Sequence, residues 1–217
     1  MKIKLCATPL RAAMLIGGIL FAGVLLATTA HAEEGNGKRL YLVQEDWEMT
    51  INDPDVATHS PQITFFACPN ATNEDCYFQL QMNYHAHDEF SGGGFHVAAF
   101  RDDTQIDEAR SDTRLPLRVD GDHIRWTNVI AANNDKLFFA VNDGHGNDWG
   151  NFGGPDYLVS MPANGVNDLT NYRHQKSLEM VDVGFGANRV SWIKLIRVRY
   201  YFTDGTSVKV ELHQTAL

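Results

Sequence analysis

The segment from 77 to 85, YFQLQMNYH, alternates apolar and polar side chains at every second position. Phe78, Leu80 and Met82 fall on one side of an extended chain, and the polar residues between them fall on the other. A period of two residues is typical of a strand that is buried on one face only. The segment therefore predicts a sheet whose apolar face must be covered by a second layer.

Short runs of the same kind fill most of the chain after residue 38, and turn residues separate them. Further strands are expected at 39–51, 62–67, 94–100, 123–132, 136–141, 157–161, 189–202 and 207–212. The turns NNDK (133–136) and TDGT (203–206) are typical of hairpins. One short helix near 167–179 cannot cover so many strands. The expected fold is therefore all-β, an antiparallel, jelly-roll-like sandwich of two sheets.

The first 32 residues are expected to be a signal peptide. Lys2, Lys4 and Arg11 precede an apolar run from Ala12 to Ala27, and Ala30-His31-Ala32 is a small-x-small cleavage signal. An uncleaved membrane anchor is the alternative, but the run is short for a span of about 20 residues. Residues 33–38 are expected to form a polar leader, and 39–217 a single sandwich domain that is secreted or periplasmic.

The charge of the chain restricts its partners. The full sequence has a formal net charge of −9, and the expected signal peptide carries three basic residues and no acidic ones. Its removal would lower the charge to −12. Because phosphate backbones repel so acidic a protein, nucleic acid is excluded as a partner. No membrane span is expected after cleavage.

Two cysteines remain in the mature chain, Cys68 and Cys76, in the segment FACPNATNEDCYF. In an exported protein this pair is expected to form a disulfide that closes a short loop between two strands. A metal pair is the alternative, but the spacing of two to four residues found in zinc sites is missing.

Three sequence stretches carry a resemblance. EDWEM…SPQITF, WGNFGG and VGFGANRVSWIKLIRVR look like a group of small exported bacterial proteins of unknown function, over most of the mature chain. The strand pair ending in FFAVNDGHGNDWGNFGG also resembles concanavalin A-like and laminin G-like sandwiches. That second resemblance implies glycan or calcium binding, although a shared fold does not assign a function.

A first candidate site is the histidine-rich stretch NYHAHDEFSGGGFHV. His85 and His87 would point to the same side of a strand, and His96 follows a glycine-rich turn. Three imidazoles could hold zinc with one open position for water. The alternative is a polar strand end with solvated histidines, and the spacing matches no metalloenzyme motif.

A second candidate site is the segment 142–157, NDGHGNDWGNFGGPDY. Asp143 and Asp148 offer oxygen ligands for calcium, although the segment lacks the EF-hand pattern. Trp149 and Phe152, with Asn147 beside them, could bind a sugar ring. Alternatively, the glycines and asparagines only turn the chain and the two aromatic rings cap the core.

The remaining motifs do not point to catalysis. Gly184-Phe185-Gly186 precedes a strand rather than a helix, so it is no nucleotide loop, and Arg189 is expected to bond nearby carbonyls or an acid. No G-x-S-x-G elbow is present. The expected protein is a non-catalytic sandwich that binds glycan or another cell-surface component, with calcium as the one cofactor considered. The alternatives are a polysaccharide hydrolase or lyase, and a structural envelope protein.

Overall fold

A computed structural model describes residues 37–72, 75–84, 93–111 and 115–217. The expected signal peptide, His85 and His87 lie outside these residues. Within the described part of the chain, no helix is long and apolar enough to cross a membrane.

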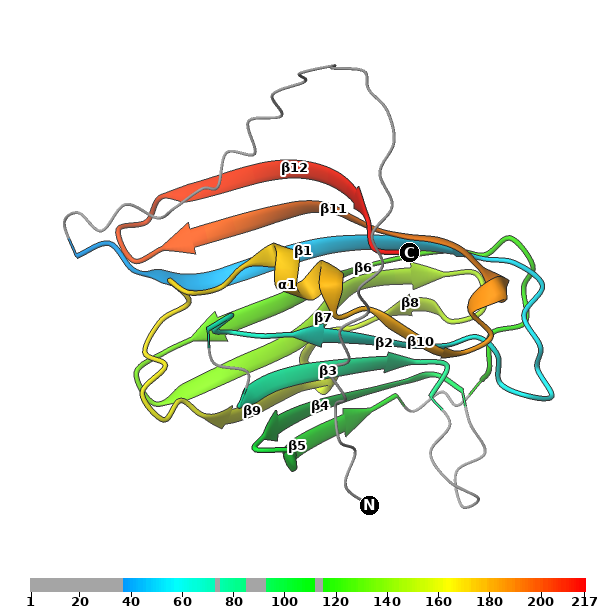
Figure 1. Ribbon diagram of the computed structural model, residues 1–217, viewed down its shortest axis with the longest axis horizontal. Coiled ribbons are helices and arrows are strands. Elements are labelled where there is room, and N and C mark those ends of the chain that lie inside the picture. Colours follow the sequence, from blue (N-terminus) through cyan, green and yellow to red (C-terminus); the bar gives the residue numbers. More distant parts are fainter. Residues whose placement is uncertain (1–36, 73–74, 85–92, 112–114) are drawn as a thin grey trace, which may run out of the picture. The chain divides into compact units, whose positions relative to one another are not determined.

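The fold is all-β, and its strands pair antiparallel in two sheets, as the sequence predicts (Figure 1). The larger sheet has the order β12-β11-β1-β6-β7-β8, with β9 also paired to β7. Its strands are β1 (Leu40–Ile51), β6 (His123–Ala132), β7 (Lys136–Gly146), β8 (Gly150–Phe152), β9 (Leu158–Pro162), β11 (Val190–Phe202) and β12 (Ser207–Thr215). The smaller sheet has the order β10-β2-β3-β4-β5. Its strands are β2 (Gln62–Ala67), β3 (Cys76–Met82), β4 (Phe95–Arg101), β5 (Thr104–Arg110) and β10 (Asp182–Phe185).

Among the residues that the structure describes, helical structure is limited to short pieces. The helix expected near 167–179 is present as α1 (His174–Glu179), and the 3₁₀ turns are η1 (Pro155–Tyr157) and η2 (Ala187–Arg189). Three strands were not expected from the sequence: β5, β8 and β10. All three lie at sheet edges, and most of their side chains are exposed or half-buried, so no apolar alternation marks them.

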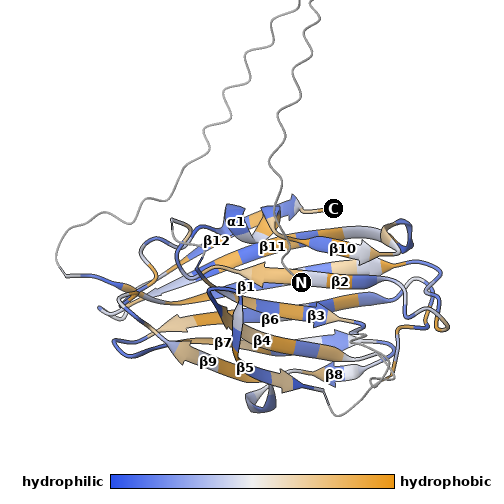
Figure 2. Cartoon of the chain, turned by 60° about the horizontal axis from the view of Figure 1, so that its bottom comes forward, coloured by the Kyte–Doolittle hydropathy of each residue, from blue (hydrophilic) through white to orange (hydrophobic). Residues whose placement is uncertain are grey.

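The alternation in the sequence becomes the burial pattern of the strands. Every second residue of β3, from Cys76 to Met82, is buried, and β1 alternates in the same way from Val43 to Ile51. Figure 2 shows this alternation as hydrophobic and hydrophilic bands along the strands. The core between the sheets centres on Trp47 and Trp126, whose stacked rings lie 6.3 Å apart and contact Phe65 edge-on.

One carboxylate lies inside this core. Glu45 is fully buried and accepts hydrogen bonds from Trp47 Nε1 at 3.0 Å, Asn128 Nδ2 at 3.2 Å and the Tyr172 hydroxyl at 2.5 Å. A buried charge is tolerated when several donors satisfy it. Burial and the nearby carboxylate raise the pKa of Tyr172 well above its usual value. The segment before α1 is thereby tied to the core.

The expected disulfide between Cys68 and Cys76 is not formed in the structure, where both cysteines are reduced and buried. The register of β2 and β3 pairs Ala67 with Phe78, so continuing it by one residue places Cys68 opposite Tyr77. Cys76 is one position further along, and its side chain therefore points to the other face of the sheet. Cys76 packs in the core, whereas Cys68 Sγ lies 3.6 Å from Met180 Sδ.

Candidate functional site

The outer face of the larger sheet carries a row of polar side chains that runs across the strands. The Cα partners across five neighbouring strands, from β11 to β8, are Lys194, Glu48, Arg125, His145 and Asn151. We call these five residues the polar row. Each of them is exposed or half-buried, so the row faces away from the core. Strand pairing brings these residues together, because Glu48, Arg125 and Lys194 come from distant parts of the sequence.

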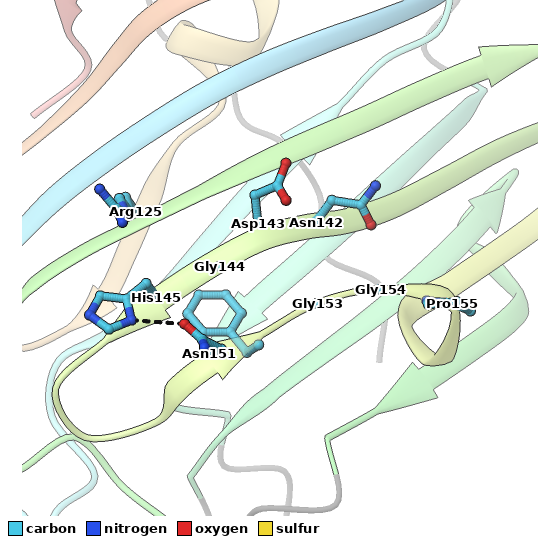
Figure 3. Close-up of a pocket in the computed structure, with 10 residues that line it drawn as sticks. Arg125, Asn142, Asp143, Gly144, His145, Asn151, Gly153, Gly154 and Pro155 are labelled. Carbon is cyan, nitrogen blue, oxygen red and sulfur yellow. Dashed lines mark hydrogen bonds between the residues drawn. The ribbon is translucent and has the colours of Figure 1, made fainter.

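One end of the polar row lies in an open depression of about 630 Å³ (Figure 3). Its lining residues come from β6, β7, β8 and the turn after β8, and they are Arg125, Asn142, Asp143, Gly144, His145, Asn151, Phe152, Gly153, Gly154 and Pro155. The Nδ1 atom of His145 lies 3.1 Å from Oδ1 of Asn151, which joins β7 to β8 at the rim. The depression therefore has a guanidinium, an imidazole, a carboxylate and two amides around it.

Arg125 differs from the other arginines on this face. Arg197 and Arg199 lie 2.7 Å and 2.6 Å from the carboxylate oxygens of Asp46, and that carboxylate also accepts a hydrogen bond from Thr127. Arg125 has no ion pair or hydrogen bond with any residue that the structure describes. Its guanidinium therefore has its donors available at the edge of the depression.

Close packing around the β7–β8 hairpin requires at least two of the glycines between 142 and 157. A Cβ atom on Gly144 would lie 2.2 Å from the ring of Phe152, and one on Gly153 would lie 2.6 Å from the carbonyl oxygen of Val141. Gly153 also has φ of +96°, which disfavours other residues. The missing side chains let the short strand β8 pack closely against β7 and let the ring of Phe152 turn inward.

Trp149 and Phe152 belong to the core and do not form the sugar platform that the sequence suggested. Trp149 is 9% exposed and Phe152 is 8% exposed, and both rings pack against Phe95. The indole Nε1 of Trp149 donates a hydrogen bond to the carbonyl oxygen of Leu115 at 2.8 Å. The alternative reading, in which these rings cap the core, is the one found. Asn147 is exposed, and its backbone N–H donates a hydrogen bond to the carboxylate of Asp122.

The carboxylate of Asp148 is used inside the protein. It accepts hydrogen bonds from the backbone N–H of Arg118 and Val119 and from Nε of Arg118, and the side chain is 1% exposed. The side-chain carboxylate of Asp122 in turn accepts hydrogen bonds from the backbone N–H groups of Asn147 and Asp148. These bonds clamp the turn between β7 and β8 to the segment before β6.

The calcium prediction for Asp143 and Asp148 therefore does not fit this geometry. Asp143 is an exposed residue with φ of +52°, whereas the oxygens of Asp148 already have donors. Within the described residues, no group of three or more His, Cys, Asp or Glu side chains is placed to hold a metal ion.

His96 is the one described member of the expected zinc patch, since His85 and His87 lie outside the described residues. Its Nδ1 lies 3.0 Å from Gln81 Oε1, and its Nε2 lies 2.8 Å from Glu108 Oε2. The ring is buried and stacks on Tyr84 at 4.6 Å. Burial lowers the pKa of His96, although the neighbouring Glu108 carboxylate favours the charged form. Both ring nitrogens are thus occupied by side chains of this chain.

Arg189 behaves as the sequence predicts. Its guanidinium donates to the backbone carbonyl of Asp53 and lies 3.3 Å and 3.7 Å from the carboxylates of Asp53 and Asp55. It therefore holds the segment after β1 against the start of β11.

Sequence reasoning missed Arg125, Asn151 and Trp192. Arg125 lies at an outward position of a strand that was correctly expected, where a charged residue looks like an ordinary solvated one. Trp192 belongs to the expected strand 189–202, and it lies half-buried on the outer face opposite Thr50. The alternation of Trp192 and Lys194 with the buried Ile193 and Leu195 was the signal that could have placed Trp192 outside the core.

No protein-family model matches the chain, and no curated protein matches it. Among solved structures, it is similar to an ancestral congerin at 14% identity, covering 73% of this chain and 94% of the other, with a TM-score of 0.36. Chicken galectin 2 follows at 12% identity, covering 74% and 98%, with a TM-score of 0.30. Ligand-free congerin I shares 14% identity over 61% and 90%, with a TM-score of 0.29.

The strand pairing defines the class of this protein as an antiparallel two-sheet β-sandwich. The resemblance to small exported bacterial proteins stays a prediction.

Proposed function

We propose that this chain is a glycan-binding β-sandwich whose ligand lies in the depression on the outer face of the larger sheet. The observation that carries the proposal is the open depression, in which free donors and acceptors from β6, β7 and β8 lie side by side (Figure 3). Trp149 does not line this depression, and Phe152 lines it with a ring that is mostly buried.

The chemistry of the lining suits a ligand rich in hydroxyl groups. A sugar hydroxyl both donates and accepts hydrogen bonds, and neighbouring hydroxyls present such groups in pairs. The guanidinium of Arg125 only donates, the carboxylate of Asp143 only accepts when ionised, and the amides of Asn142 and Asn151 do both. A few such polar groups fixed on a rigid sheet can orient a small ligand.

The same lining favours binding without catalysis. Glycoside hydrolysis generally needs two carboxyl groups, about 5 to 9.5 Å apart, on either side of the scissile bond. Asp143 is the only carboxylate among the described residues that line the depression. The hydrolase alternative therefore lacks a second acid at this place.

The proposal includes export of the chain to the periplasm or the cell exterior, where glycans are abundant. The basic n-region, the apolar run and the Ala30-His31-Ala32 signal support it. Intact mass of the exported protein should begin at Glu33, and a mass that includes residues 1–32 would contradict cleavage.

Binding to an array of neutral and acidic oligosaccharides tests the proposed function. Wild type should retain at least one class of glycan, and Arg125→Ala should lose it, because the free guanidinium contacts the ligand. Arg39→Ala is the matched control: it removes the same charge from an exposed position outside the depression. Equal binding by wild type and Arg125→Ala, or no binding by wild type, would overturn the proposal.

A further inference from the structure

We propose that the binding site continues from the depression across the sheet to Trp192, so that its ligand is an extended oligosaccharide rather than a single sugar. This inference rests on the proposed function, because it extends the same face. It assigns Trp192 as a second contact for the ligand, at the far end from His145 and Asn151.

The polar row connects the two ends. Arg125 on β6 lies opposite Glu48 on β1, and Glu48 lies opposite Lys194 on β11. In the next row, His123 lies opposite Thr50, and Thr50 lies opposite Trp192. Cross-strand neighbours on one face have side chains in contact range. A ligand that leaves the depression over Arg125 therefore passes directly onto polar groups that lead to Trp192.

Trp192 is held in position by its neighbours. Nζ of Lys194 lies 4.6 Å from the centre of its ring, and the ring of His123 lies 5.6 Å away at a tilt of 58°. Nε2 of His123 in turn lies 3.4 Å from Oε2 of Glu48. The indole N–H has no partner among the described residues, so it is open to a ligand. A half-buried aromatic ring with fixed surroundings is a suitable surface for the C–H face of a sugar ring.

The distance between the two ends sets the size of the ligand. β11 and β8 are separated by four strand spacings of about 4.8 Å, or about 19 Å in all, which one sugar ring cannot span. The charges along the polar row alternate in sign, since the acidic Glu48 lies between the basic Lys194 and Arg125. Mixed charges of this kind repel part of any polyanion, whereas they offer both donors and acceptors to a neutral chain of hydroxyl groups. A neutral oligosaccharide is therefore the favoured occupant.

Affinity as a function of chain length tests this inference. The probes are oligomers of one to six units in three neutral series, made of glucose, galactose and N-acetylglucosamine. In a series that binds, affinity of the wild type should rise with length and then level off. Trp192→Ala should bind the shortest binding oligomer as the wild type does and the long ones about 3- to 10-fold more weakly. Trp192→Phe, which keeps an aromatic face, should retain most of the length dependence.

Phe185→Ala is the matched control, because Phe185 is an exposed aromatic residue on the other sheet, and it should leave the length dependence unchanged. Melting curves verify that each variant is folded. If wild type binds but affinity is independent of length, or if Trp192→Ala binds long oligomers like the wild type, the inference is wrong and the proposed function stands. Loss of binding at every length in Arg125→Ala, with weaker binding only at long lengths in Trp192→Ala, supports both.

Discussion

The indole Nε1–H of Trp149 donates a 2.8 Å hydrogen bond to the backbone carbonyl oxygen of Leu115. This bond joins the turn after β7 to the segment that leads to β6, and the ring itself packs edge-on against Phe95 and Phe152. A tryptophan in a turn rich in glycine and asparagine is thus a core residue.

We predict that Trp149→Ala destabilises the protein by about 3–5 kcal/mol, since it removes a large buried ring and leaves a cavity. Chemical denaturation measures the change in the free energy of unfolding. Trp192→Ala is the comparison: its half-exposed ring should cost much less. An unchanged unfolding curve for Trp149→Ala would show that this ring is not part of the core.

We predict that Asp148→Asn also destabilises the protein, by about 1–3 kcal/mol, because an amide nitrogen would face donors that now bond a carboxylate. Asp143→Asn, at an exposed position, should leave stability unchanged.

Thermal melting with and without millimolar calcium tests whether this loop binds the ion. Calcium should not raise the melting temperature, since Arg118 and Val119 occupy the Asp148 oxygens. A calcium-dependent rise that Asp148→Asn abolishes would contradict this.

We predict that stability falls as the pH decreases below about 6.5. Burial lowers the pKa of His96 and of His174 from the usual value of 6.5. The unfolded chain therefore takes up these protons at a higher pH than the folded chain. Their contribution to stability is complete above pH 6.5 and is lost as the pH falls toward the lower folded values.

The measurement for this prediction is the melting temperature between pH 7.5 and 5. In His96→Gln, which cannot titrate at that position, the melting temperature should change less steeply with pH. A slope that is identical in wild type and His96→Gln would refute the role of His96.

We predict that Cys68 and Cys76 do not react with a thiol reagent in the folded protein and react fully after denaturation. Both side chains are buried, and burial raises the pKa of Cys76, which keeps it in the unreactive thiol form. Titration of thiols under native and denaturing conditions measures this. An intact mass two hydrogens below that of the dithiol would reveal the disulfide that the register of β2 and β3 disfavours.

The sequence by itself determined the class of the fold and its hairpins. Period-two alternation in 77–85 and its counterparts is local information, because the two faces of a strand are set by the geometry of the extended chain. Turn chemistry is local for the same reason, and the turns at 133–136 and 203–206 join strands as predicted. Arg189 could also be anticipated, since a guanidinium beside several acids and carbonyls finds partners nearby.

Only the tertiary structure decided the strand register, which aromatic rings are buried, and where the depression lies. The register of β2 and β3 places Cys68 and Cys76 one position out of line, so their side chains point to opposite faces of the sheet. The loop sequence between the two cysteines does not specify this register. Trp149 is buried and Trp192 lies on the outer face because burial depends on which distant strands lie over a ring. Arg125, His145 and Asn151 meet through the pairing of three strands, so their neighbourhood is a property of the sheet rather than of any one segment.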